Sequence, residues 1–458
     1  MQGKIRNEQR ASSCPRALIA AAVLLTCVSS ARPQCYVEES QRLPGHMRHD
    51  DFGQASALDG DLLVIGSPEG GAGPGRVEVY RRAEGLWTHV QTVTADDAAL
   101  DDRFGSSLEL KDGLLAVAAP TDDPDRGDDA GAVYVFRYDG DAFIQEAKLI
   151  GSATSAGDRF GSGVEIAADQ VLVLSEAENL VYGFADEGGA WSEIARIPTG
   201  AANTSRIAAD RNVLLVYAAN TREVTVYRFD PPNWLPFQVV PTGLLSEIDL
   251  RGENAVFAYG PFSDDAAAVV YLDVHGALLE QARIPVTTEH QGFDAAIAGD
   301  HLVLTVGHFL DRQILYLYRR DGGTWSFVSK LVRSDMPVAD PFISVALDAD
   351  TAVLGIPADA QTGRAYVFDG LGAIAAGCDP CALIRTLKTR CRDGKLLVKI
   401  KSDLHHDERL HVDIGGDVFI IAFNERGTGK VKRSRQSGMI DVSVLECPGV
   451  NRSVDCGA

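Results

Sequence analysis

Residues 101–149 read DDRFGSSLELKDGLLAVAAPTDDPDRGDDAGAVYVFRYDGDAFIQEAKL, and this stretch contains four successive strand patterns. The expected strands cover residues 104–110, 114–119, 132–136 and 143–149. The first alternates apolar and polar residues, whereas the second is continuously apolar, as in a strand covered on both faces. Lys111-Asp112-Gly113 supplies turn residues after the first strand, and Pro120 ends the second. The stretch therefore predicts one four-stranded antiparallel sheet.

The same unit occurs seven times between residues 51 and 373. An apolar residue precedes the first turn of each copy, at Leu58, Leu110, Ile166, Ile207, Leu250, Ile297 and Leu347. An aromatic residue closes the third strand of each copy, at Tyr80, Phe136, Phe184, Tyr227, Tyr271, Tyr318 and Phe368. A period of roughly 40–50 residues with several short strands per copy is typical of propeller blades. The sequence predicts an all-β protein with a seven-bladed β-propeller over residues 36–373.

The seventh copy lacks a fourth strand, and an unassigned strand precedes the first copy. That segment, residues 36–43, ends in Gln41-Arg42-Leu43, much as a fourth strand ends in Ala147-Lys148-Leu149. We therefore expect residues 36–43 to form the outer strand of the seventh blade and to close the ring, so that its two edges pair with each other.

Three copies begin with a recognisable motif. Asp51-Phe52-Gly53, Asp102-Arg103-Phe104-Gly105 and Asp158-Arg159-Phe160-Gly161 resemble the opening of FG-GAP repeats. Residues 115–120 followed by 131–136 resemble the second half of such a repeat. The later copies lack the Phe-Gly pair at the aligned place. FG-GAP repeats build the seven-bladed propeller of integrin alpha subunits and of many exported bacterial proteins, so the resemblance implies an extracellular binding or adhesion scaffold.

The N-terminal segment, residues 1–31, has the pattern of a secretory signal peptide. Four basic residues flank an apolar run over residues 17–28, and Ser29-Ser30-Ala31 offers small residues for cleavage near Ala31. No later run is long enough to span a bilayer, so we expect no membrane insertion. The sequence thus predicts a secreted protein, extracellular or periplasmic, with protein or glycan ligands outside the cell.

Charge is unevenly distributed along the chain. Residues 376–458 hold 14 Lys and Arg against 11 Asp and Glu, and residues 1–31 also carry +3. Subtracting +3 for each end from the total of −21 leaves −27 for residues 32–375. Because residues 32–375 are so acidic, we do not expect nucleic acid as a partner. After the joint of mostly small residues at 373–377, we expect residues 376–458 to form a small β-sandwich-like domain that contains cysteines.

Six cysteines remain after removal of residues 1–31. They are Cys35, Cys378, Cys381, Cys391, Cys447 and Cys456. In an exported chain an even number favours disulfides, although six allow fifteen pairings. Cys35 is expected near the last blade, within reach of Cys378 or Cys381. The alternative is a zinc site that begins at Cys378 and Cys381 and is completed by Cys391 or a histidine.

An acidic loop in the second copy is the strongest metal candidate. Asp122, Asp125 and Asp128 belong to a run of five carboxylates in eight residues, which could supply the hard oxygen ligands that calcium prefers. The loop departs from the D-x-D-x-D-G calcium motif of FG-GAP repeats, so a solvated acidic loop without an ion is the alternative. No other cofactor is expected. The tripeptide Arg126-Gly127-Asp128 matches an integrin-recognition motif, but so short a match carries little weight.

No catalytic motif is present in the chain, since it has neither a Gly-x-Ser-x-Gly elbow, a His-Glu-x-x-His helix nor a phosphate-binding loop. We therefore expect a non-enzymatic binding or adhesion scaffold. The alternative is a propeller-type polysaccharide hydrolase or lyase that uses carboxylates at the mouth of the axial channel. An enzyme should show carboxylates there in paired, perturbed environments, whereas a scaffold should show an unremarkable or merely acidic mouth.

Overall fold

The computed structural model describes the chain in segments. They are residues 36–45, 50–68, 73–124, 127–199, 204–259, 267–274, 277–285, 294–308, 311–332, 344–357, 363–374, 384–393, 395–402, 409–414, 417–422, 424, 426–434, 437–444 and 447–457. Among these residues there is no α-helix, and one 3-10 helix, η2, covers Leu371–Ala373. None of the helices described there is long and apolar enough to cross a membrane. The expected signal peptide, together with Cys35, Cys378 and Cys381, lies outside the described residues.

The part of the chain before residue 370 folds into successive sheets, each formed mainly by antiparallel neighbours in sequence. The first three are β3 (Ser56–Asp59), β4 (Leu62–Ser67), β5 (Arg76–Ala83) and β6 (Leu86–Val93); β7 (Leu108–Lys111), β8 (Leu114–Ala119), β9 (Ala132–Tyr138) and β10 (Phe143–Leu149); and β11 (Gly163–Ala167), β12 (Gln170–Ser175), β13 (Leu180–Asp186) and β14 (Trp191–Pro198).

The later sheets of this part follow the same order. They are β15 (Thr204–Asp210), β16 (Val213–Ala218), β17 (Glu223–Asp230) and β18 (Asn233–Pro241); β19 (Leu245–Arg251), β20 (Asn254–Tyr259), β21 (Ala267–Val274) and β22 (Ala277–Pro285); β23 (Ala295–Ala298), β24 (His301–His308), β25 (Asp311–Asp321) and β26 (Thr324–Val332); and β27 (Ser344–Asp348), β28 (Thr351–Ile356) and β29 (Arg364–Asp369).

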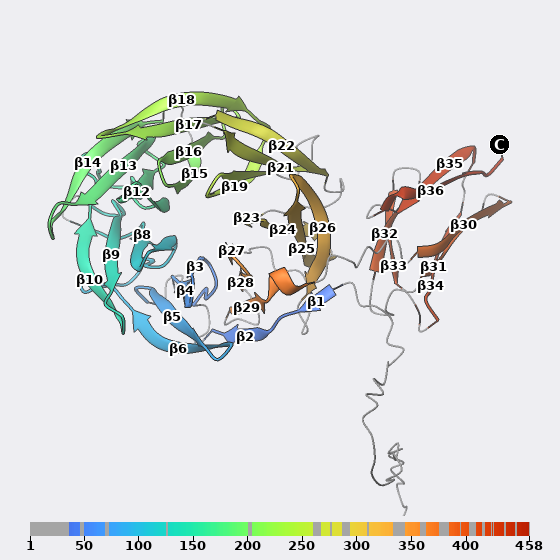
Figure 1. Cartoon of the computed structure of the whole chain (residues 1–458), viewed down its shortest axis with the longest axis horizontal. Coiled ribbons are helices and arrows are strands. Elements are labelled where there is room, and N and C mark those ends of the chain that lie inside the picture. Colours follow the sequence, from blue (N-terminus) through green and yellow to red (C-terminus); the bar gives the residue numbers. More distant parts are fainter. Residues whose placement is uncertain are drawn as a thin grey trace, which may run out of the picture. The chain divides into compact units, whose positions relative to one another are not determined.

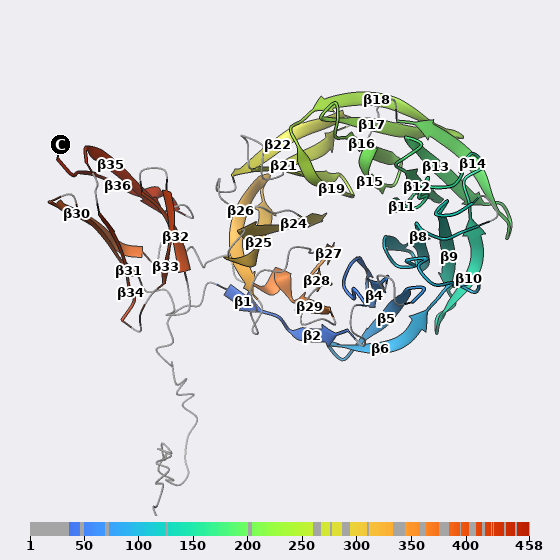
Figure 2. The same cartoon turned by 180° about the vertical axis from the view of Figure 1, so that it is seen from behind.

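These sheets are arranged around a common axis (Figure 1), and the view from behind shows the same ring (Figure 2). The first strand of each sheet is innermost and contacts the first strand of the next, from β3 through β27, and β27 contacts β3 again. The core lies between neighbouring sheets, where for example Val64 and Val79 pack in one cluster with Leu115 and Tyr134. This all-β arrangement of mostly four-stranded sheets is consistent with a β-propeller.

The N-terminal segment divides between two sheets. β2 (Gln41–Pro44) pairs antiparallel with β29, which makes it the outer strand of the last sheet. β1 (Tyr36–Glu38) instead pairs in parallel with β26 of the preceding sheet. The expectation that all of residues 36–43 would lie on the last sheet was therefore wrong for residues 36–38. The chain bends between the two strands, and the Ser40 hydroxyl donates to the Val367 carbonyl and to Asp369 at 3.0 and 2.9 Å.

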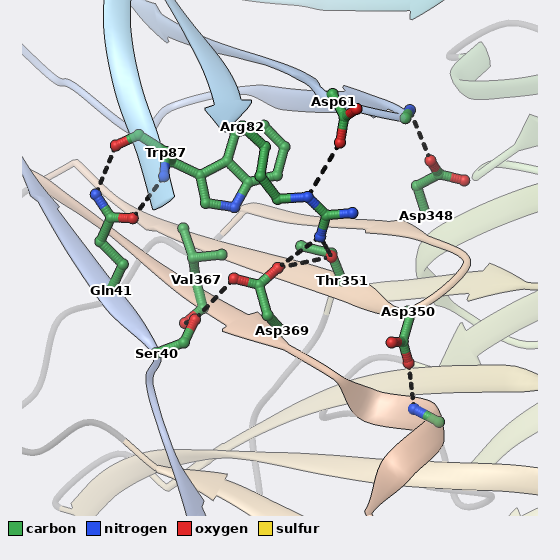
Figure 3. Close-up of polar contacts among 12 residues, drawn as sticks. Ser40, Gln41, Asp61, Arg82, Trp87, Asp348, Asp350, Thr351, Val367 and Asp369 are labelled. Atoms are coloured by element: carbon green, nitrogen blue, oxygen red, sulfur yellow. Dashed lines mark hydrogen bonds and ion pairs between the residues drawn. The ribbon is translucent and has the colours of Figure 1, made fainter. Parts of the chain in front are cut away.

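Gln41 links this outer strand to the first sheet (Figure 3). Its side chain donates to the Trp87 carbonyl at 2.6 Å and accepts from the Trp87 N–H at 2.8 Å. Glutamines on other outer strands make the same pair of bonds to the next outer strand, Gln91 with Phe143 and Gln238 with Leu278. β2 thus has the contacts of an ordinary fourth strand.

Arg82 of β5 adds a second link at this junction (Figure 3). Its guanidinium lies 3.1 Å from Asp61 of its own sheet and 3.1 Å from both Thr351 and Asp369 of the last sheet. Thr351 and Asp369 both accept from the same guanidinium nitrogen. Arg82 therefore links the first sheet to the last sheet, although the two are far apart in the sequence.

The Phe-Gly pairs join neighbouring sheets through their backbones. The Phe104 N–H donates to the Pro74 carbonyl at 2.9 Å, and the Phe160 N–H donates to Ala130 at the same distance. The glycine that follows each acceptor approaches the phenylalanine backbone so closely that a Cβ at Gly75 or Gly131 would lie 2.2 or 2.3 Å from its carbonyl oxygen. Gly363 meets the Phe52 carbonyl in the same way, at 2.2 Å. The motif is therefore a docking element between sheets.

Two further sheets follow residue 383. One consists of β30 (Ile384–Arg392), β31 (Lys395–Ser402) and β34 (Thr428–Ser434), and the other of β33 (Asp417–Ala422), β32 (Arg409–Ile414), β35 (Met439–Val444) and β36 (Cys447–Asp455). Leu396, Val398 and Ile400 of the first sheet share a hydrophobic core with Val412 and Val442 of the second.

A disulfide joins these two sheets. Cys391 of β30 is bonded to Cys456, directly after β36. The disulfide excludes Cys391 as a ligand of the alternative zinc site. It also excludes Cys456 as the partner of Cys35. Cys447 stands at the start of β36.

Candidate functional site: the axial charge cluster

Charged residues gather on the innermost strands, where the sheets meet around the axis. They are Glu109 and Lys111 of β7, Glu165 of β11, Asp210 of β15, and Asp249 and Arg251 of β19. Lys111 forms an ion pair with Asp210, although the sheet of β11 lies between theirs. Arg251 Nη2 lies 2.9 Å from Glu109 Oε1, although two sheets separate β7 from β19. These ion pairs therefore connect inner strands that are not neighbours in the ring.

Each junction between neighbouring inner strands also carries a side-chain-to-backbone hydrogen bond. Carboxylates accept N–H groups of the next sheet in six cases: Asp59 from Gly113 at 3.2 Å, Glu165 from Ala209 at 3.2 Å, Asp210 from Gly252 at 2.6 Å, Asp249 from Ile297 at 2.8 Å, Asp294 from Val345 at 2.7 Å and Asp348 from Gly60 at 2.9 Å. In the remaining case the Lys111 ammonium donates to the Ile166 carbonyl at 3.3 Å. We call these seven bonds the axial clasps.

Burial changes the protonation equilibria of this cluster. It raises the pKa of Glu165 well above its ordinary value, and the neighbouring charge of Glu109 adds to the effect. The pKa values of Glu109 and Asp249 are also raised by burial, against the opposing charge of Arg251. For Asp210, burial would raise the pKa, but the hydrogen bonds from Lys111 and the Gly252 N–H lower it overall. The cluster therefore holds carboxyl groups with raised pKa values next to one whose pKa is lowered.

A second group of the same kind lies on the following inner strands. Arg206 Nε of β15 lies 3.4 Å from Glu247 Oε2 of β19. Burial raises the pKa of Glu247, and it raises that of Asp294 well above the ordinary value, with the charge of Glu247 contributing. Burial thus raises the carboxyl pKa values of five residues of this region, Glu109, Glu165, Glu247, Asp249 and Asp294.

Replacing Glu165 by Gln should stabilise the protein at pH 8 more than at pH 4. Because the folded-state pKa is raised, the stability that Glu165 contributes is complete below its unfolded-state pKa and is lost as the pH rises through the folded value. The glutamine side chain does not titrate and keeps an oxygen for the Ala209 N–H. Urea unfolding at several pH values measures the difference. The control is Glu176→Gln, at an exposed residue after β12; an equal response of both variants to pH would contradict the assignment.

Two open cavities lie beside the cluster, on the face formed by the turns between first and second strands. The larger, of about 740 Å³, is lined by residues of three sheets, among them Lys111, Arg137, Asp169, Trp191, Asp210, Arg211, Asn212 and Phe229. The second, of about 420 Å³, is lined by Arg211, Arg251, Gly252, Asn254 and Asp348, among others. Arg211 borders both cavities. This face therefore offers aromatic rings next to amide and charged groups.

The structure describes two of the three calcium candidates in the acidic loop, Asp122 and Asp128. Asp122 is buried, with 3% of its surface exposed, and accepts hydrogen bonds from Tyr134 and from Lys148, the latter at 2.9 Å. Asp128 is exposed, while Asp125 and Arg126 lie outside the described residues. Within the described part of the chain, no group of three or more His, Cys, Asp or Glu residues has the geometry of a metal site.

Comparison with known proteins finds an FG-GAP repeat in one segment of this chain. Residues 87–136, from β6 to the third strand of the next sheet, match the FG-GAP repeat family. They include the docking pair Phe104-Gly105, so the chain contains an FG-GAP repeat in a propeller-type all-β fold. No curated protein matches the chain.

Several solved structures are similar to it. A chain of the mitotic checkpoint complex is 12% identical, with 76% of this chain and 99% of that chain covered and a TM-score of 0.48. The periplasmic gluconolactonase of Pseudomonas aeruginosa is 14% identical, with 61% and 85% covered and a TM-score of 0.44. A candidate 6-phosphogluconolactonase of Bacteroides uniformis is 11% identical, with 61% and 85% covered and a TM-score of 0.46. At such identities the likeness gives no information on activity.

Proposed function

We propose that the protein is a secreted, non-enzymatic binding scaffold. In this proposal the signal peptide is removed near Ala31, residues 36–373 form a seven-bladed propeller closed by the N-terminal strand, and residues 376–458 form a small β-sandwich-like domain. The set of axial clasps carries the proposal. The carboxyl groups at the axis already hold neighbouring sheets together or pair with Lys111 and Arg251, so they serve the ring itself.

The ligand surface in this proposal is the face that contains the two cavities. Trp191 and Phe229 provide apolar area there, and Asp169, Arg211 and Asn212 provide donors and acceptors. Rings beside planar polar groups suit a neutral glycan, which offers both apolar ring faces and hydroxyl groups. Because Arg211 borders both cavities, a ligand that extends across this face would contact its guanidinium.

The second candidate is a hydrolase or lyase that acts on polysaccharide. One observation favours it: Glu109 and Glu165 lie close enough for their charges to interact, and both have a raised pKa because they are buried. Such pairs are common in active sites, but structural ion-pair networks perturb pKa values in the same way. The clasp from Glu165 to Ala209 and the ion pair from Glu109 to Arg251 favour the structural role.

One experiment separates the two candidates. A panel of neutral oligosaccharides is tested for binding to the mature chain and for the appearance of new reducing ends. If the protein is a scaffold, it should bind an oligosaccharide without cleaving it. Arg211→Gln should weaken this binding about tenfold, and Glu165→Gln should leave it unchanged. The matched control is Arg222→Gln, since both arginines are exposed, have positive φ (51° and 58°) and flank strand β16 at its opposite ends. Turnover that Glu165→Gln abolishes would overturn the proposal.

A further inference from the structure

The outer face of the sheet formed by β30, β31 and β34 is cationic. Side chains alternate between the two faces of a strand, so every second residue belongs to this face. The residues of β30 and β31 on this face are Thr386, Lys388, Arg390, Arg392, Lys395, Leu397, Lys399 and Lys401, and those of β34 are Thr428, Lys430, Lys432 and Ser434. Eight of these twelve are Lys or Arg, and none is acidic. The opposite face supplies Leu387, Leu396, Val398 and Ile400 to the core.

The register places like charges directly side by side. Lys399 is opposite Lys388 on one neighbouring strand and opposite Lys430 on the other, so that three lysines form a row across the sheet. Paired residues on one face lie about 5 Å apart, and like charges in this position destabilise a sheet. All eight cations except Lys399 are exposed, and Lys399 is half-buried between its two neighbours. At the edge of the face, Arg392 Nε lies 3.8 Å from Asp393 in the adjoining turn.

A row of mutually repelling lysines costs folding free energy, so a compensating interaction is expected to explain it. The rest of the chain provides a contrast, because residues 32–375 carry a net charge of −27 and repel polyanions. On an otherwise acidic protein, a polyanion would bind at this cationic face and be repelled elsewhere. Rows of outward residues repeat every ~7 Å along the strands, which suits a chain with regularly spaced negative groups.

We propose that this face binds an acidic polysaccharide, that is, a chain with carboxylate or sulfate groups. Six of the eight cations are lysines, which act as flexible, strongly hydrated point charges and suit a hydrated anion. None of the twelve residues is aromatic, so no ring is offered on which a base could stack, which disfavours single-stranded nucleic acid. Leu397 is the only apolar residue of the twelve, too little to anchor the face in a bilayer. The proposal does not depend on whether the propeller is a scaffold or a hydrolase.

The experiment measures binding of the mature full-length chain to immobilised alginate and heparin over a range of salt concentrations. We expect binding to both, and the triple variant Lys388→Gln, Lys399→Gln, Lys430→Gln should weaken it by roughly tenfold or more at about 0.15 M salt. The slope of log K against log salt should become less negative by roughly one for each lysine removed. The Lys→Arg triple variant should retain binding, because the charges remain.

A matched control removes three positive charges elsewhere. Arg81→Gln, Arg426→Gln and Arg452→Gln together change the charge equally, at exposed residues outside this face. The melting temperature of the Lys→Gln variant should not fall, because the replaced row is repulsive. Unchanged binding in that variant, equal loss in the control, or no binding to either polysaccharide would overturn the proposal. Binding confined to double-stranded DNA, or confined to phosphatidylserine vesicles, would also overturn it and would assign the face to that partner.

Discussion

A chain that starts at Gly45 is expected to melt at least about 10 °C below a chain that starts at Tyr36. The shorter chain lacks β1 and β2, so β26 and β29 each lose a hydrogen-bonded neighbour. It also lacks Leu43, which is 3% exposed and packs with Val353 and Val367. Loss of a buried leucine side chain alone costs about 2–5 kcal/mol. The hydrogen bonds of Gln41 to Trp87 would also be lost, as would those of Ser40 to Val367 and Asp369.

Differential scanning calorimetry of the two chains is the measurement, and both lack Cys35, so a disulfide at that residue cannot cause the difference. Leu43→Ala within the longer chain isolates the packing contribution and should account for part of the loss. Arg42→Gln, at the exposed neighbour on the same strand, should change the melting temperature little. Equal melting temperatures for the two chains would mean that the last sheet does not need its outer strand.

Gly131→Ala is expected to destabilise the protein by about 2–4 kcal/mol. Gly131 has φ of 85°, and its Cβ would lie 2.3 Å from the Phe160 carbonyl oxygen and 2.6 Å from its nitrogen. The left-handed backbone costs an alanine about 1 kcal/mol. Relief of the contact requires the Phe-Gly segment to move away from the preceding sheet, and such overpacking typically costs about 1–3 kcal/mol.

Gly140→Ala separates these two causes. Gly140 also has a positive φ, 104°, but a Cβ there would meet no atom within 4 Å. It therefore reports the conformational cost without the contact. Urea unfolding of both variants should show a clearly larger loss for Gly131→Ala. If the two variants lost the same stability, the Phe-Gly pair would not be a tight docking element between sheets.

The repeat was accessible from sequence because it rests on periodicity. Leu58, Leu110 and the other apolar anchors lie on the first strands, and Tyr80, Phe136 and the other aromatic anchors lie on the third. The division of residues 36–43 was not accessible. Tyr36–Glu38 and Gln41–Pro44 are equally strand-like in sequence. The first pairs with β26 and the second with β29, and this difference depends on the position of β26 beside the ring closure.

The axial cluster could not be found from sequence, because Glu109, Glu165 and Asp249 come from separate copies and share no spacing that marks them out from other carboxylates. They meet only when the first strands surround one axis. The cationic face left a clearer signal. Lys395, Lys399 and Lys401 alternate with Leu396, Val398 and Ile400, which is the pattern of a strand with one basic face. The net charge of residues 376–458 conceals it, because acidic residues lie elsewhere in that segment.

For the acidic loop, composition gives ligand types but not their partners. The carboxylate of Asp122, one of the calcium candidates, accepts hydrogen bonds from Lys148 and Tyr134. A cation on the neighbouring strand cannot be assigned to a given loop carboxylate from sequence.

The central claim is that the propeller closes by pairing of its N-terminal strand with its last sheet, and a designed disulfide tests it most directly. Pro44 and Arg364 are Cα partners across β2 and β29, and both are at least partly exposed. The variant Pro44→Cys, Arg364→Cys should form a disulfide under oxidising conditions, detected by non-reducing peptide mapping. The variant Glu38→Cys, Arg364→Cys should not, because Glu38 pairs with Val332 of the other sheet. Two free thiols in the first variant, or a bond between the introduced cysteines in the second, would contradict the closure.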